Sequence, residues 1–560
     1  MKILHLHIVC ILLLISNTLS SQEIVIDLQN PQRLSEKVFV HYNSSMLIPG
    51  ERLYYKVYNF NPNSNEQSEI SRIVHVMLIS ENGERAFTHV LDLKDGVAYS
   101  DYLVPSSLAT GNYSLMAYTN WMLNYKTPAF FEEDIVVLNP YSPGWENKLK
   151  EIKYNRSKDS VANNKVLSSS INFDKNTYGK REKVLIELNL PDSISYSNLS
   201  LSVNKFEQVS VSGPGKLTES NKSSSGEFNL KHYPEYRGRH FTGSIIDSVG
   251  QKIPGKKTLF FNPASNSSKV RIFETKQDGS FDIQISDIID YKEFELFTIE
   301  DENNVVVLDS IGPDFQNTNK SLAEGLSVEN LGDFKKKVIH FQIEESYKIV
   351  KSDSVMQYKG KEDFYGSLAQ EYILDDYTRF STMEETLTEI ITGVRFVNGG
   401  VGKQIRVSNS GNTNTIGGIP LILLDGKMVK NHQTIYDLNP ATVYSMDVVR
   451  DKYYFGPEFY QGILSIRSKP DFTGNLPSNR FQISPAESKK EYYFAKYEER
   501  GQLKTNDRVP DYRHQLYWEP DLKSSSVKFY TSDVEGIFEV RIEGFYNNKP
   551  VSISKRFSVQ

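Results

Sequence analysis

Short stretches of alternating apolar and polar residues, separated by glycine turns, fill the first quarter of the chain. Between residues 22 and 140, the stretches ERLYYKVYNF, RIVHVMLI and NYSLMAYT are bounded by turn sequences such as ENGE, LKDG and ATGN. A period of two is the pattern of a strand with one buried face. The composition, with 33 Tyr and 30 Phe but only 3 Trp, also favours strands over helices. We therefore predict a mainly β protein built from a string of sandwiches.

The N-terminus has the three-part layout of a secretory signal peptide. Lys2 precedes an apolar run from Ile8 to Ile15, and we expect cleavage after the small residues near Ser20. This run is less than half of the roughly 20 residues that a membrane-spanning helix needs, so the mature chain is not expected to span a membrane. Cys10, the only cysteine, lies in the same segment. A mature chain without cysteine has no disulfide, no thiol nucleophile and no thiolate metal site.

Two groups of stretches resemble known domain families. EKVFVHYNSSMLIPGERLYYKVY, VMLISENGE and LATGNYSLMAYTNWMLN resemble the second domain of the macroglobulin family, as it occurs in exported bacterial proteins. Further along, TGSIID is followed 36 residues later by DGSF. This pair resembles the small seven-stranded regulatory domains found in front of outer-membrane receptors and behind some carboxypeptidases. These resemblances imply that both segments fold as sandwiches of the immunoglobulin type.

Residues 335 to 395 interrupt the β pattern. Met383, Leu387 and Ile391 recur at helical spacing, and Thr382 is placed to cap this helix with Glu385 three residues behind it. We predict a helical spacer in this part of the chain.

The stretch IPLILLDGKMV is an apolar run that enters an Asp-Gly turn. Asn439 and Pro440 then predict the start of a helix, and YSMDVVRD and GILSIRS predict two more strands. From Gly417 to Pro470 this β-α-β-β pattern resembles the plug of TonB-dependent outer-membrane receptors. A receptor barrel of about 22 strands needs several hundred more residues, whereas 131 follow Val429, so no barrel is expected.

In this plug-like unit, we expect Leu421, Leu423 and Ile463 to be buried against the unit's own helix and the GILSIRS strand. Near the end of the chain, GIFEVRIEGF alternates apolar with charged residues, which predicts a half-buried strand in a closing sandwich.

The chain thus resembles a family of exported Bacteroidota proteins that lack a barrel. The predicted units are a signal peptide (1–21), a macroglobulin-like sandwich (22–140), a linker (141–170), a second sandwich (171–235), a carboxypeptidase-regulatory-like sandwich (236–320), a helical spacer (321–395), a plug-like α+β domain (396–475) and a C-terminal sandwich (480–560).

One set of residues has the spacing of a carboxypeptidase zinc site, which uses a His and a Glu three apart plus a distant His. His232, Glu235 and the downstream His340 fit this spacing. Such spacing often arises by chance, and Pro234 breaks the local frame between the first two. We therefore interpret the segment as a surface loop and expect His232→Ala and Glu235→Ala to be nearly neutral.

Other motifs of chemistry are incomplete. Val397 to Gln404 lacks the first glycine and the hydroxyl residue of a phosphate loop, so a glycine-rich turn is expected. The acidic pairs Asp375-Asp376 and Glu384-Glu385 and the run Glu300 to Asn303 lack calcium-loop spacing, and GxSxG is absent. A Ser-His-Asp set from distant parts of the chain stays open. We assign no catalytic, cofactor-binding or metal-binding residue and no cofactor.

A net charge of -6, with no basic block, makes nucleic acid and nucleotides unexpected partners. The best hypothesis is a non-enzymatic accessory or scaffold protein of the cell envelope, located in the periplasm or at the cell surface. Its expected partner is an outer-membrane β-barrel protein or complex. The alternatives are a ligand- or glycan-binding module beside a nutrient transporter, with aromatic residues as stacking surfaces, and a hydrolase with an unrecognised site.

Overall fold

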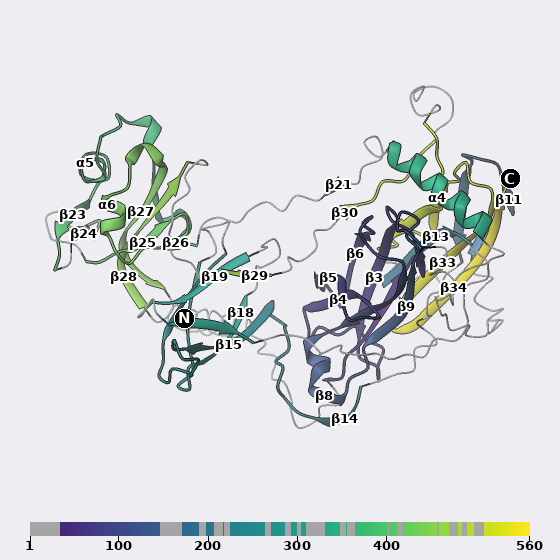
Figure 1. The fold of residues 1–560 in the computed structure, drawn as a ribbon, viewed down its shortest axis with the longest axis horizontal. Helices are drawn as coiled ribbons and strands as arrows, with labels where there is room; N and C mark the ends of the chain where they lie inside the picture. Colours follow the sequence, from purple (N-terminus) through teal and green to yellow (C-terminus); the bar gives the residue numbers. More distant parts are fainter. Residues whose placement is uncertain are drawn as a thin grey trace, which may run out of the picture.

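A computed structural model gives the fold. The residues that the structure describes are 34–145, 171–189, 198–206, 217, 224–263, 270–285, 293–299, 304–309, 331–347, 354–355, 364–400, 402–411, 418–455, 458–469, 480–483, 490–497 and 509–560. The predicted signal peptide and most of the predicted linker lie outside them. The described part is mainly β, as predicted, and consists of a body of two sandwiches and an arm that contains a third sandwich and an α+β unit (Figure 1).

The first sandwich corresponds to the predicted macroglobulin-like unit. Turns separate its strands where the sequence predicts them. Gly50 and Gly83 occupy the left-handed region at two of these turns, with φ of 91° and 81°. The three-stranded sheet is β1 (Lys37–Tyr42), β3 (Arg52–Phe60) and β6 (Val97–Leu103). The five-stranded sheet is β2 (Met46–Leu47), β9 (Phe131–Val137), β7 (Gly111–Tyr118), β4 (Ile73–Ser80) and β5 (Arg85–Asp92).

The second sandwich is made from two distant parts of the chain. We predicted separate sandwiches for residues 171–235 and 480–560, but their strands pair with one another, because neither part has enough strands to close a core alone. One sheet is β10 (Ile171–Phe173), β12 (Lys183–Leu188) and β32 (Ser526–Tyr530). The other is β11 (Thr177–Tyr178), β34 (Lys549–Val559), β33 (Gly536–Tyr546), β13 (Leu199–Lys205) and β31 (Gln515–Glu519).

The two sandwiches of the body are stacked, so that the three-stranded sheet of the first is covered on both faces. Its outer face meets the five-stranded sheet of the second sandwich, where Tyr58 and Phe60 lie 6.0 and 4.8 Å from Phe545, ring centroid to ring centroid. β33 was predicted to be half-buried. Phe538, Val540 and Ile542 are buried as predicted, but Arg541 and Glu543 are also buried, because the first sandwich covers the face that a lone sandwich would expose to water.

The third sandwich follows a two-stranded ribbon of β8 (Tyr125–Thr127) and β14 (Ser225–Phe228). It has seven strands, of which six belong to the predicted 236–320 unit and one comes from residues 480–482. One sheet is β18 (Ser280–Ile285), β15 (Arg239–Ile246) and β20 (Val305–Leu308). The other is β17 (Arg271–Glu274), β16 (Thr258–Pro263), β19 (Glu293–Thr298) and β29 (Arg480–Gln482).

The α+β unit begins earlier than predicted, because residues 370–391 join it instead of forming a spacer. Thr382 and Glu385 form the predicted capping box of α5 (Met383–Glu389). The sheet is β22 (Gln370–Ile373), β27 (Val443–Phe455), β28 (Glu458–Ser468), β25 (Leu421–Leu424) and β26 (Lys427–Met428), and β25 and β28 are parallel. The hairpin of β23 (Val394–Asn398) and β24 (Lys403–Val407), α6 (Gln433–Tyr436) and the 3-10 turns η8 (Gly366–Leu368), η9 (Leu374–Asp376) and η10 (Pro440–Thr442) complete it. Asn439 caps η10, which is one turn long where we predicted a helix.

β25 is buried on both faces, and the two faces have different partners. Ile422 and Leu424 face α5 and α6 in the core of the unit. Leu421, Leu423 and Ile463 are buried as predicted, but they pack against β16 and β17 of the third sandwich. The predicted contact of these three residues with the unit's own helix is wrong, because the helices lie on the opposite face of the sheet.

The one long helix among the described residues, α4 (Leu331–Ser346), lies against the body, as Figure 1 shows. Phe334 and Phe341 pack on Met46 and Ile48 of the first sandwich. Lys337 forms a buried ion pair of 3.0 Å with Glu51. Two short strands, β21 (Ser354–Val355) and β30 (Lys490–Glu491), form an antiparallel pair.

Candidate functional site

The three residues with zinc-site spacing do not come together. Glu235 lies at the entry to the third sandwich, where its carboxylate is 3.3 Å from Nε2 of His75 and accepts a hydrogen bond from the backbone N–H of His240 at 3.0 Å. His340 lies on α4, where its ring stacks on Tyr512. Among the described residues, no group of three or more His, Cys, Asp or Glu is arranged to hold a metal ion.

The surface-loop interpretation of this segment is wrong for Glu235. Its exposed fraction is 2%, and its backbone carbonyl accepts a hydrogen bond from Arg72 of the first sandwich. Glu235 therefore joins the first sandwich to the third, a role that spacing along the chain does not reveal. His232 is half-buried, and its backbone N–H and C=O bond to the side chain of Asn124.

The other candidates of the sequence have structural roles. Val397 to Gln404 spans the turn of the β23–β24 hairpin, with Gly402 in the left-handed region at φ 74°. Lys403 in this turn pairs with Glu384 of α5 at 2.8 Å. Asp375 pairs with Arg379, which holds the pKa of that carboxyl below its usual value. The run from Glu300 to Asn303 lies outside the described residues.

One serine and one histidine from distant parts of the chain meet between the two sandwiches of the body. The Nδ1 atom of His41 is 2.5 Å from the hydroxyl oxygen of Ser200. Burial, with the positive charges of Arg541 and Lys56, lowers the pKa of His41 well below its usual range. Both His41 and Ser200 have an exposed fraction of 0%, so no substrate reaches this pair. Its geometry fits a hydrogen bond that joins two sheets.

The interface between these sandwiches also contains a completely buried lysine. Lys56 Nζ donates to the carbonyl of Pro520 at 2.6 Å and pairs with Asp521 at 3.0 Å. Tyr58 donates to Ser200 at 2.8 Å. Because an unpaired charge in such a place costs several kcal/mol, these contacts hold the sandwiches in one relative orientation. The body can therefore act as a rigid frame.

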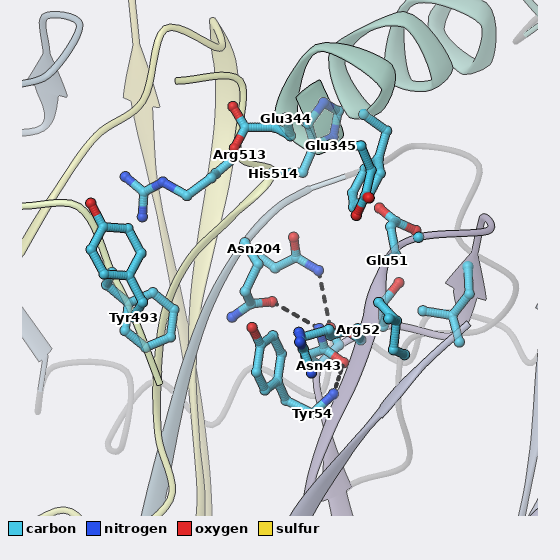
Figure 2. A pocket seen from close by; sticks show the side chains of 17 residues that line it. Asn43, Glu51, Arg52, Tyr54, Asn204, Glu344, Glu345, Tyr493, Arg513 and His514 are labelled. Atoms are coloured by element: carbon cyan, nitrogen blue, oxygen red, sulfur yellow. Dashed lines mark hydrogen bonds between the residues drawn. The ribbon is translucent and has the colours of Figure 1, made fainter. Parts of the chain in front are cut away.

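A cavity of about 160 Å³ lies where the first sandwich, the second sandwich and α4 meet. Figure 2 shows Asn43 and Arg52 on one side and Glu344 of α4 on the other. Asn43 donates to Gln515 at 3.0 Å and accepts from the backbone of Tyr54 at 3.0 Å. These amides already bond across the joint between the sandwiches. The cavity is therefore best described as part of that joint.

Among the residues that the structure describes, the most exposed pair of aromatic side chains lies at the far end of β27 and β28. Tyr454 and Phe459 are directly opposite one another in the hairpin, and their exposed fractions are 75% and 62%. Their ring centroids are 6.2 Å apart and the rings are tilted by 42°. Lys452 lies 5.8 Å from the ring centroid of Phe459. Aromatic residues with high exposure are typical of protein and membrane contacts.

The sequence contains signals for both the buried joint and the exposed hairpin. In β3, apolar residues occupy both alternating sets of positions around Lys56, a pattern of a strand covered on two faces. In YYFGPEFY, aromatic residues precede and follow the Gly-Pro pair. Because successive side chains of a strand point to opposite faces, only every second one of them can face a core.

Among the described residues, no helix combines the length and apolarity that a bilayer crossing requires. No family model matches the chain, and no curated protein matches its sequence. One similar solved structure is Salmonella α-2-macroglobulin reacted with methylamine, with 8% identity, a TM-score of 0.22 and coverage of 94% of this chain and 39% of that one. Escherichia coli α-2-macroglobulin activated by porcine elastase has 9% identity, a TM-score of 0.23 and coverage of 94% and 44%.

An adhesin from Yersinia pseudotuberculosis has 8% identity and a TM-score of 0.15, and covers 53% of this chain and 66% of that one. The chain spans less than half the length of these two macroglobulins.

Proposed function

We propose that this chain is a non-enzymatic accessory protein of the cell envelope, and that its α+β unit docks onto an outer-membrane protein complex. The observation that supports this proposal is the exposed aromatic pair Tyr454 and Phe459 on the β27–β28 hairpin. The hairpin extends beyond the rest of its sheet, because β22 and β25 pair only with residues 445–448 and 463–466. It therefore presents this pair beyond the edge strands of its own sheet.

The hairpin is a well-anchored element. Its other face contributes Tyr453 and Tyr460 to the apolar contact with the third sandwich, and Tyr453 donates to the carbonyl of Phe364 at 3.1 Å. Gly462, with φ 84°, lies opposite the register shift between Val449 and Lys452 of β27, which separates the hairpin from the rest of the sheet. A rigid support lowers the entropy that a partner must remove on binding.

The geometry favours a protein partner over a glycan. A sugar ring stacks best on one flat surface, whereas the rings of Tyr454 and Phe459 are tilted by 42° to one another. Exposed tyrosine and phenylalanine side chains can enter a pocket of a protein surface as anchors.

The test is the double substitution Tyr454→Ser and Phe459→Ser in the full chain, with Tyr444→Ser as the matched control. Tyr444 is also on β27 and is 44% exposed, but it is far from the hairpin end. Both variants should change stability by less than about 0.5 kcal/mol, because the residues are on the surface.

We expect the double variant to lose co-purification with an outer-membrane protein after gentle solubilisation, and the control to keep it. Equal recovery of the partner with the double variant would show that docking takes place elsewhere. Binding of the wild-type protein to a glycan array, lost in the double variant, would favour the glycan-binding alternative.

A further inference from the structure

One edge of the third sandwich lacks the protection that the other sheet edges have. β20 pairs with β15 on one side, and no described strand pairs with its other side. An open edge presents unpaired N–H and C=O groups, and proteins usually protect it with charged residues or proline. β20 consists of Val305, Val306, Val307 and Leu308 and has neither.

The contrast with the other described edges is complete for strands of four or more residues. Each of the others contains at least one charged residue within the strand. In the same sheet, the opposite edge strand β18 contains Asp282, which pairs with His240. The first sandwich has Arg85 and Asp92 in its edge strand β5. The uncharged sequence of β20 is therefore an exception within this molecule.

The exposed side chains of β20 are apolar as well. Val305 and Val307 are 42% and 40% exposed, whereas Val306 between them points into the core at 4%. The backbone N–H of Asp309 donates to the carbonyl of Thr242 in β15. In an antiparallel pair, every second residue bonds to the neighbouring strand, so the backbone N–H and C=O groups of Val306 and Leu308 point toward the open side. The edge thus combines an unpaired backbone with a small apolar surface.

We infer that β20 is a binding site for an extended segment of a partner protein, which adds to the sheet as a fourth strand. This inference rests on the proposed function as a binding protein and adds a second contact to it. Main-chain hydrogen bonds give such strand addition its affinity, and alternate side chains give it specificity. The segment should place β-branched residues beside Val305 and Val307 and a basic residue near the exposed Asp309.

A second copy of this chain is a weaker fit to the same edge. Two four-residue strands bury far less than the roughly 1,200 Å² of a stable protein interface, whereas a short peptide needs no more than one such edge. The size of β20 therefore favours a linear segment over a dimer.

The experiment uses the full chain, the synthetic peptide acetyl-Lys-Val-Thr-Val-Thr-Val-Lys-amide, and hydrogen exchange followed by mass spectrometry. A version of the peptide methylated on alternate backbone nitrogens has the same side chains but cannot complete the ladder. The test variant is Val307→Lys, which gives β20 the charge that the other edges have. The control is Val249→Lys, since Val249 is 76% exposed in the turn after β15 and is not part of the edge.

We expect the unmodified peptide to slow exchange in residues 304–309 by about tenfold in the wild type and in Val249→Lys, with little change in Val307→Lys. The methylated peptide should have no effect. Three results would overturn the inference: no slowing by the peptide, equal slowing in Val307→Lys, or slow exchange at this edge before peptide is added. In the last case protection that rises with protein concentration would identify a second copy as the occupant. None of these results depends on the hairpin residues, so the proposed docking site stands or fails separately.

Discussion

Replacing Glu235 with alanine tests the revised role of this residue as the joint between the first and third sandwiches. The carboxylate is 2% exposed, and its two donors, Nε2 of His75 and the backbone N–H of His240, belong to residues that are 8% and 6% exposed. Alanine leaves both donors buried without this acceptor. Each such group costs about 1 to 3 kcal/mol, and the longer contact of 3.3 Å to His75 places its share at the lower end.

We therefore expect Glu235→Ala to destabilise the joint by about 2 to 4 kcal/mol. His232→Ala should cost less than about 1 kcal/mol, because its side chain is half-buried and its bonds to Asn124 come from the backbone. Hydrogen exchange of β4 and β15, followed by mass spectrometry, locates the effect within this multidomain chain better than one unfolding midpoint does. A loss in Glu235→Ala no larger than in His232→Ala would refute the assignment of this joint.

Three further substitutions have distinct expected outcomes. Leu423→Asp places a charge in the completely buried contact between the α+β unit and the third sandwich, and should lower the free energy of unfolding by several kcal/mol. Protease should then cleave residues 400–470 while the first sandwich stays resistant. Equal resistance of both regions would contradict this prediction. Gly462→Ala should lower the melting temperature more than Gly83→Ala, because both glycines have positive φ but only at Gly462 would a Cβ meet a backbone oxygen, that of Val449, at 2.2 Å; equal shifts would contradict it. Burial lowers the pKa of His89 from 6.5 to about 4 in the folded chain, so the unfolded chain binds this proton more tightly. Up to roughly 3 kcal/mol of stability is therefore present above pH 6.5 and is lost as the pH falls toward 4. His89→Gln should flatten that part of the pH dependence in urea unfolding, and an unchanged profile would count against it.

Local features of the fold were predictable because short-range chemistry determines them. The capping box of Thr382 and Glu385 and the turn at Gly83 depend on residues within a few positions of one another. The apolar run around Leu421 likewise predicts that this strand is buried, without saying by what. Alternation along β33 likewise identified its apolar face. These signals describe one element at a time.

The partners of these elements were not predictable in the same way. Alternation gives a strand two faces but does not say what covers the second one, so the burial of Glu543 and the position of Lys56 between two sandwiches required the structure. Glu235 shows the same limit, because the residues next to a glutamate in the sequence do not reveal whether its carboxylate is buried or exposed. The pairing of β13 with β31 and β33 has no local signal at all.

That pairing has a consequence for the order in which the molecule folds. β13 lies between β31 and β33, and both neighbours leave the ribosome roughly 300 residues after it. Until then β13 has two open edges and the apolar residues Leu199, Leu201 and Val203, a combination that promotes aggregation. The arm is synthesised in full after the first part of the second sandwich and before its second part. A chain interrupted between β29 and β31 would therefore present a finished arm on an unfinished body, and its open strand edges would make it a preferred substrate for chaperones and proteases.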